Sequence, residues 1–106
     1  MGKFAEDILF PRGLSADLGD LFDPPQIMKN VAEWRGMSDV ECYRTFNCGN
    51  GMLVAIDEED IPVTLKRAEL FRLRAKVVGR ITRNNTPSLL IRSGFSGRKL
   101  EYSSRD

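Results

Sequence analysis

The fold is decided by residues 38–56, which read SDVECYRTFNCGNGMLVAI. Ser38, with Glu41 three residues later, forms a capping box and predicts the start of a helix. The helix is expected to end near Asn47, where a loop with two glycines begins. Met52–Ile56 is apolar at every position, which predicts a strand buried on both faces. A helix, a loop and a strand therefore follow one another directly.

Two more helices are expected around this stretch. One is predicted over residues 24–35, where Asp23 is the expected N-cap and Gly36 ends the helix. The other is predicted to begin near Ile61 with Asp60 as its N-cap, and to end around residues 72–74. The acidic run before it complements the positive end of the helix dipole.

Short strands complete the expected fold. Ala75–Ile81 and Ser88–Arg92 read as strands, and Ile8–Phe10 reads as at most an edge strand because a proline follows it. Helices and strands in this order predict an α/β (α+β) class, a small mixed sheet with helices packed on it. One domain is expected over 1–92, and 93–106 is expected to be a flexible basic tail.

Charge is divided unevenly along the chain. Residues 1–60 carry 5 basic and 12 acidic side chains, a net of −7, whereas residues 61–106 carry 11 basic and 3 acidic ones, a net of +8. A basic half is typical of nucleic-acid binding, or of two halves that complement each other in the fold. Phe71 is the only aromatic residue near the basic cluster, which argues against nucleic acid because base stacking needs more.

Composition excludes several chemistries. The chain has no histidine, which excludes Ser-His and Cys-His catalysis and histidine-containing zinc sites. Cys42 and Cys48 are the only thiols, too few for a disulfide scaffold, so a reducing, cytoplasmic setting is expected. No apolar run is long enough to span a membrane, and the first residues do not read as a signal peptide.

The loop at residues 47–51 has two interpretations. Glycines let the backbone approach a ligand closely, which is typical of an anion-binding loop. Phosphate-binding loops, however, run from strand to helix, and this loop runs from helix to strand. It is therefore not a Walker or dinucleotide motif, and a sharp helix-to-strand connection is the alternative.

The same stretch is similar to a known family. Residues 43–52, YRTFNCGNGM, resemble a motif in the C-terminal part of phosphoribosylformylglycinamidine cyclo-ligase, also called aminoimidazole ribonucleotide synthetase. Residues 11–19, 24–28 and 76–81 resemble segments around that motif, so the resemblance covers 8–92. Asn50 departs from the family pattern, which usually has an apolar residue there.

The resemblance implies an activity in de novo purine biosynthesis. The family uses ATP and Mg²⁺ to close the imidazole ring of aminoimidazole ribonucleotide from formylglycinamidine ribonucleotide. Its enzymes are homodimers of two-domain subunits, and the N-terminal domain supplies much of the ATP site. Only about the last third of such an enzyme is matched, so we expect the chain to be inactive alone and to bind no cofactor tightly.

The resemblance also suggests site residues. Substrate-binding roles fall on five residues at the end of the expected helix and in the loop: Arg44, Thr45, Asn47, Gly49 and Gly51. Asn47 and the two glycines would shape the wall of the cleft, and Arg44 and Thr45 would orient the loop or contact a substrate phosphate. No catalytic acid or base is identified, and no metal ligand is expected. The alternative roles are a solvated helix residue for Arg44 and a local backbone hydrogen bond for Thr45.

Two kinds of partner are expected. The first is the missing N-terminal part of the enzyme, or a second chain that supplies it. The second follows from unpaired strand edges, which favour self-association. As an alternative to catalysis, the chain would be a non-catalytic binding or interaction module derived from that domain.

Overall fold

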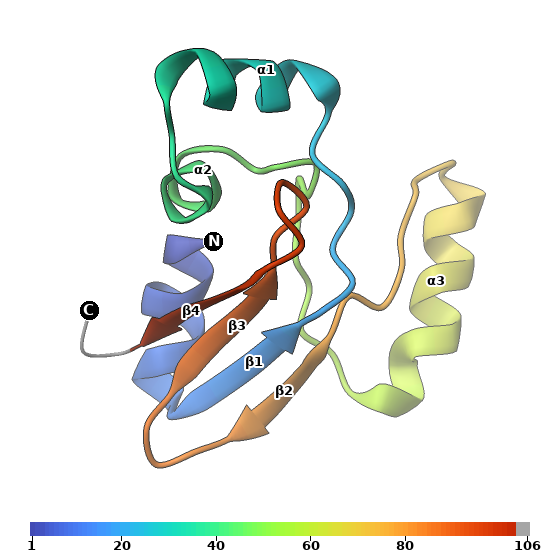
Figure 1. Cartoon of the computed structure of the whole chain (residues 1–106). Coiled ribbons are helices and arrows are strands. Elements are labelled where there is room, and N and C mark those ends of the chain that lie inside the picture. Colours follow the sequence, from blue (N-terminus) through green and yellow to red (C-terminus); the bar gives the residue numbers. More distant parts are fainter. Residues whose placement is uncertain (104–106) are drawn as a thin grey trace.

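The structure is a computed structural model that describes residues 1–103 of the 106. Its centre is a four-stranded mixed sheet with the order β2-β1-β3-β4 (Figure 1). Strand β1 runs parallel to β3 and antiparallel to β2, and β4 runs antiparallel to β3. The expected small mixed sheet with helices is therefore confirmed. The strands are β1 (Leu14–Leu18), β2 (Arg80–Arg83), β3 (Ser88–Arg92) and β4 (Lys99–Ser103).

One face of the sheet is apolar and carries the core. Ala16 lies opposite both Ile81 and Leu89, and Leu18 lies opposite Ile91, so these side chains share a face. All of them except Ile81 are buried. The residues between them are mostly polar, the alternation that a sheet with one solvated face requires.

Helical segments from two parts of the chain supply the rest of the core. The N-terminal π-helix contributes Ala5 and Leu9, and the helix before the glycine loop contributes Cys42 and Tyr43. Tyr43 is fully buried, and its ring meets the ring of Phe95 edge to face. The helical elements are η1 (Phe4–Leu9), η2 (Phe10–Arg12), α1 (Gln26–Arg35), α2 (Asp39–Thr45), η3 (Glu58–Asp60) and α3 (Ile61–Leu70).

Most expected helix ends are confirmed. Gly36 ends α1 in the left-handed conformation, with φ of 61°. The Ser38 hydroxyl accepts a hydrogen bond from the Glu41 N–H at 3.2 Å, as a capping residue does. Asp60 precedes α3 as expected, although its side chain makes no capping bond. The N-cap of α1 is Pro25 and not Asp23.

The prediction of an edge strand near the N-terminus is wrong. Ile8–Phe10 is helical and not an edge strand, because Pro11 sits in the first turn of η2, where a proline is well tolerated. The strand β1 follows directly and lies between β2 and β3. The sequence analysis did not predict it, because its five residues include only three apolar ones.

The expected strand Met52–Ile56 is also wrong. This segment belongs to no helix or strand, and the side chains of Met52, Val54 and Ile56 are exposed. Its apolar residues read as a buried strand, but the described part of the chain places no other strand beside them. The expected strand Ala75–Ile81 is displaced: the strand that pairs, β2, runs from Arg80 to Arg83 and overlaps the prediction only at residues 80–81.

The C-terminal residues differ from the expected flexible tail. Residues 94–96 form a turn, and β4 follows at the edge of the sheet, with Tyr102 buried. The Tyr102 hydroxyl donates to the Val40 carbonyl at 3.1 Å, which ties β4 to α2. Residues 104–106 of that tail lie outside the described residues.

The middle of the chain lies at the periphery. No residue from 51 to 88 is buried, and Figure 1 shows α3 standing to one side of the sheet. Of the 12 exposed large apolar side chains, nine lie between residues 52 and 81, so apolar surface is concentrated in this segment. Within residues 1–103, no helix combines the length and apolarity needed to cross a membrane.

Candidate functional site

The glycine loop is a tight reversal at the end of α2. Cys48 and Gly49 both have positive φ, 51° and 89°, and two left-handed residues in succession turn the chain sharply. The Asn47 side chain holds the turn, because its Oδ1 accepts from the Gly49 N–H at 2.9 Å. The Asn47 carbonyl accepts from the Asn50 N–H at 2.9 Å. Asn47 therefore shapes the loop from within.

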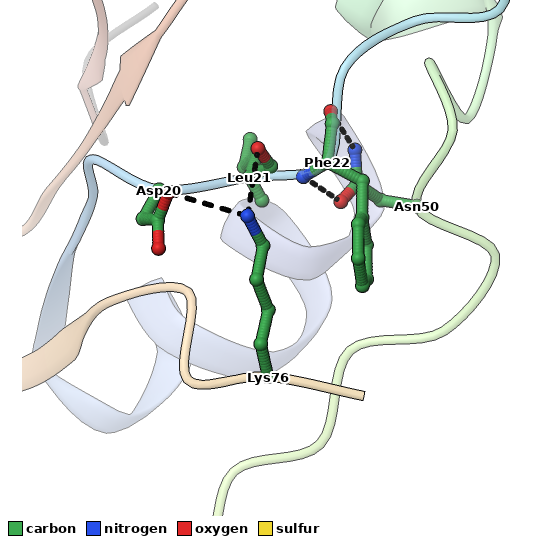
Figure 2. A network of polar contacts seen from close by, with 5 residues as sticks. All are labelled: Asp20, Leu21, Phe22, Asn50 and Lys76. Carbon is green, nitrogen blue, oxygen red and sulfur yellow. Dashed lines mark hydrogen bonds and ion pairs between the residues drawn. The ribbon is translucent and has the colours of Figure 1, made fainter. Parts of the chain in front are cut away.

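Asn50 fastens this loop to the segment that follows β1. Figure 2 shows its carboxamide beside the backbone of Phe22. The Phe22 N–H donates to Asn50 Oδ1 at 2.9 Å, and Asn50 Nδ2 donates to the Phe22 carbonyl at 3.2 Å. The same Nδ2 donates to the Cys48 carbonyl at 3.0 Å. The Asn50 amide is thus bonded to both the N–H and the C=O of Phe22, as the backbone of a neighbouring strand would be. These bonds explain why a polar residue stands where the family usually has an apolar one.

Gly49 is required by its surroundings as well as by its conformation. A Cβ added there would lie 2.4 Å from the Asp23 carbonyl oxygen, closer than atoms pack. The loop therefore rests directly on the segment between β1 and α1. A Cβ at Gly51, in contrast, would meet nothing within 4 Å. Only one of the two loop glycines is thus demanded by packing.

The remaining predicted site residues lie at the end of α2. Arg44 and Thr45 are exposed. The Arg44 guanidinium lies 5.4 Å from the centre of the Tyr102 ring, a cation–π contact with β4. Burial raises the pKa of Tyr102 to about 12, against the opposing effect of Arg44, so this phenol stays neutral. The structure thus directs Arg44 toward the sheet edge and Asn47 into its own loop.

A second cluster, which the sequence analysis missed, surrounds Phe22. The Arg74 guanidinium and the Lys76 ammonium each lie 4.8 Å from the centre of the Phe22 ring. Lys76 Nζ also lies 3.2 Å from a carboxylate oxygen of Asp20 (Figure 2). Beside Phe22 a shallow groove of about 370 Å³ opens toward α3. Phe22 lies in a stretch with no periodic pattern, so no sequence signal marked it.

The two thiols are structural in character. Cys42 and Cys48 are buried and free, and the Cys48 thiol donates to the Cys42 carbonyl at 3.5 Å. Burial raises the pKa of Cys48 to about 11, and burial followed by the nearby acids raises the pKa of Cys42. Thiols that remain protonated near neutral pH are poor nucleophiles.

Metal binding needs ligands that this part of the chain does not gather. Within residues 1–103, no group of three or more acidic or cysteine residues is placed to hold a metal ion.

The fold and the loop together define the class of this protein, a small α/β domain in which a glycine-containing turn follows a helix.

No protein-family model matches the chain. Curated proteins do match it, and those named below are all phosphoribosylformylglycinamidine cyclo-ligases. The protein of Methanococcoides burtonii is 36% identical over 89 residues, which are 84% of this chain and 22% of that protein. The protein of Caldicellulosiruptor bescii is 34% identical over 83 residues, 76% of this chain and 24% of its own length.

A third relative matches a shorter part of this chain. The protein of Methanocaldococcus jannaschii is 36% identical over 64 residues, 60% of this chain and 18% of that protein. The chain is thus a relative of the cyclo-ligases of purine biosynthesis, which confirms the resemblance read from residues 43–52. It spans about a fifth to a quarter of the length of these relatives. The substrate-binding roles of the five predicted site residues stay predictions.

Proposed function

We propose that this chain supplies one part of a phosphoribosylformylglycinamidine cyclo-ligase and acts together with a polypeptide that supplies the rest. The similarity to named cyclo-ligases over up to 84% of the chain carries the proposal. The reaction would be the ATP-dependent closure of the imidazole ring in purine biosynthesis. Because the chain spans only 18–25% of these relatives, most of the catalytic machinery would come from the partner.

The structure offers physical support for a required partner. Nine large apolar side chains between residues 52 and 81 are exposed, and apolar surface concentrated in this way is typical of an interaction site. We assign most of the ATP and Mg²⁺ contacts to the partner, because this chain spans only 18–25% of the length of its relatives. The glycine loop would form one wall of the substrate cleft, held in shape by Asn47 and Asn50.

The test is complementation of ring closure. The Caldicellulosiruptor bescii relative is truncated to remove the stretch that matches this chain, and the two polypeptides are produced together. We expect no product from either polypeptide alone and ATP-dependent product from the mixture. Turnover by this chain alone would contradict the need for a partner. A complex that forms without turnover, or no complex at all, would contradict the proposed role.

The loop gives this experiment a matched pair of variants. Gly49→Ala introduces a clash with the Asp23 carbonyl, whereas Gly51→Ala adds a methyl group in open space. If the loop forms the cleft wall, Gly51→Ala should leave the fold intact and reduce turnover in the mixture by hindering substrate. Normal turnover of Gly51→Ala would remove Gly51 from the substrate site.

A further inference from the structure

Asn50 differs from every other asparagine of the chain in the residue that follows it. The asparagines are Asn30, Asn47, Asn50, Asn84 and Asn85, and only Asn50 is followed by glycine. The backbone nitrogen of the next residue can attack the side-chain amide of an asparagine, and a side chain on that next residue hinders the attack. Glycine offers no such hindrance. Asn50 is therefore the asparagine whose sequence most favours this reaction.

The Gly51 nitrogen is unhindered in space as well as in sequence. Gly51 is exposed, and a Cβ added there would meet nothing within 4 Å. Within residues 1–103 its N–H makes no hydrogen bond. No neighbouring group therefore has to move before this nitrogen can react.

The fold protects the other reactant, the side-chain amide of Asn50. Its Oδ1 accepts from the Phe22 N–H, and its Nδ2 donates to the Phe22 carbonyl at 3.2 Å (Figure 2) and to the Cys48 carbonyl at 3.0 Å. Attack on Cγ makes this carbon tetrahedral and expels Nδ2, so both bonds of Nδ2 have to break. The reaction therefore requires that Asn50 first be released from Phe22 and Cys48.

We propose that Asn50 is a site of spontaneous deamidation, and that release of its side chain from Phe22 and Cys48 controls the rate. The Gly51 nitrogen forms a bond to Asn50 Cγ, the Cγ–Nδ2 bond breaks, and Nδ2 leaves as ammonia with the proton of the Gly51 amide. Water then opens the resulting cyclic imide to aspartate or isoaspartate. Isoaspartate adds one methylene to the main chain of the loop. This modification is independent of the proposed function.

Deamidation unfastens the loop. Neither product has the Nδ2 donor that joins Asn50 to the carbonyls of Phe22 and Cys48, and both carry a new negative charge. Ion-exchange chromatography separates the modified chain by that charge. The modified fraction should unfold at a lower urea concentration than the unmodified one, and identical unfolding would overturn this consequence.

The rate is measured on the purified chain, incubated either in native buffer or in denaturing urea. Trypsin releases residues 45–66 as one peptide, in which mass spectrometry compares Asn50 with the exposed Asn47. In urea, Asn50 should be converted faster than Asn47. In native buffer the conversion of Asn50 should be about tenfold to a hundredfold slower than in urea, because two ordinary hydrogen bonds correspond to roughly thirtyfold.

Three results would overturn the proposal. Faster conversion of Asn47 in urea would contradict the choice of site. Equal rates for Asn50 in native buffer and in urea would contradict control by its hydrogen bonds. Protection of Asn50 beyond about a thousandfold would contradict release by the loss of these bonds alone.

Two variants separate the attack from the release. Gly51→Ala keeps Asn50 in place but hinders the nitrogen, so conversion should slow at least about tenfold both in native buffer and in urea. Asn47→Ala removes the bond to the Gly49 N–H that holds the turn, so conversion of Asn50 should be severalfold faster in native buffer and unchanged in urea. Circular dichroism first establishes that both variants are folded. A Gly51→Ala chain converted at the wild-type rate would overturn the mechanism, and an Asn47→Ala chain unchanged in native buffer would overturn control by the loop.

Discussion

Removal of the Asn50 side chain should destabilise the fold more than the loss of any other side chain of the loop. Asn50→Ala removes three hydrogen bonds, two with the backbone of Phe22 and one with the Cys48 carbonyl. A typical intramolecular hydrogen bond contributes about 1 kcal/mol net. Asn50 is only 9% exposed, although water can reach the half-buried Phe22 groups. We therefore expect the free energy of unfolding to fall by about 2–3 kcal/mol.

Urea unfolding followed by circular dichroism measures this loss. Tryptophan fluorescence is a weak reporter, because Trp34 is 71% exposed in the folded chain. Asn47→Ala is the matched control. It removes the single exposed bond to the Gly49 N–H and should cost less than about 1 kcal/mol. An Asn50→Ala chain within about 0.5 kcal/mol of the wild type, with an unchanged urea dependence, would refute the role of Asn50 as the fastening of the loop.

Asn50→Asp keeps nearly the same side-chain shape as asparagine but removes its hydrogen-bond donor. Aspartate keeps an acceptor for the Phe22 N–H but directs a negative oxygen at the carbonyls of Phe22 and Cys48. At neutral pH it should be at least as destabilising as Asn50→Ala. Those carbonyls favour the protonated acid, so the variant should recover relative to Asn50→Ala as pH falls and the carboxyl gains its proton. A difference between the two variants that does not change with pH would contradict this contact.

The remaining predictions concern the loop glycines, one acid and the thiols. Gly49→Ala should cost about 2–4 kcal/mol, because φ is 89° and the Asp23 carbonyl is in the way, whereas Gly51→Ala should cost under about 1 kcal/mol. Burial opposes the charge of Asp39, but hydrogen bonds from Ser93 and Ser96 and the nearby Arg98 outweigh it and lower its pKa from 3.8. Its contribution to stability is therefore present above about pH 4 and lost below it, and acid titration of Asp39→Asn should lack that component. Cys48, with a pKa of about 11, should react with a thiol reagent near neutral pH only as fast as the chain unfolds, and rapid labelling of the folded chain would contradict its burial.

Predictions from the sequence were correct where a feature depends only on residues close together in the chain. Ser38, Glu41 and Gly36 act within a few residues of themselves, and their caps appear as predicted. The strand Ser88–Arg92 is found with the predicted bounds. In contrast, β1 is too short and too mixed to give a clear pattern, and its place in the sheet depends on partners more than 60 residues away. No local signal carries that information.

The site shows the same division. The tight turn at Asn47 and Gly49 follows from residue types that favour turns. The bond between Asn50 and Phe22 joins residues 28 positions apart, and the stacking of Arg74 and Lys76 on Phe22 spans more than 50. Both contacts depend on β1, because the segment that follows β1 places Phe22 beside the loop. Because β1 itself was not predicted, the cluster around Phe22 could not be predicted either.

Met52–Ile56 shows where an apolar pattern stops being decisive. Apolar residues at every position indicate that the segment gains stability when other residues cover it. The pattern does not indicate which residues those are. Within residues 1–103 nothing pairs with it, although β-branched Val54 and Ile56 suit a strand well. The prediction of a strand buried on both faces is therefore wrong in both respects for residues 52–56.

The uneven distribution of charge along the sequence can be compared with its distribution in the fold. The sign of the charge changes close to residue 60, at the boundary between the acidic run and α3. In space, however, Arg74 and Lys76 return to the beginning of the segment Met52–Ile56 through Phe22, while the acidic run stays at its end. Lys76 is ion-paired with Asp20 at 3.2 Å, and Arg80 with Glu58 at 3.7 Å. Each pair joins a residue of the basic half to a residue of the acidic half, so the two halves of the sequence partly complement each other within the fold.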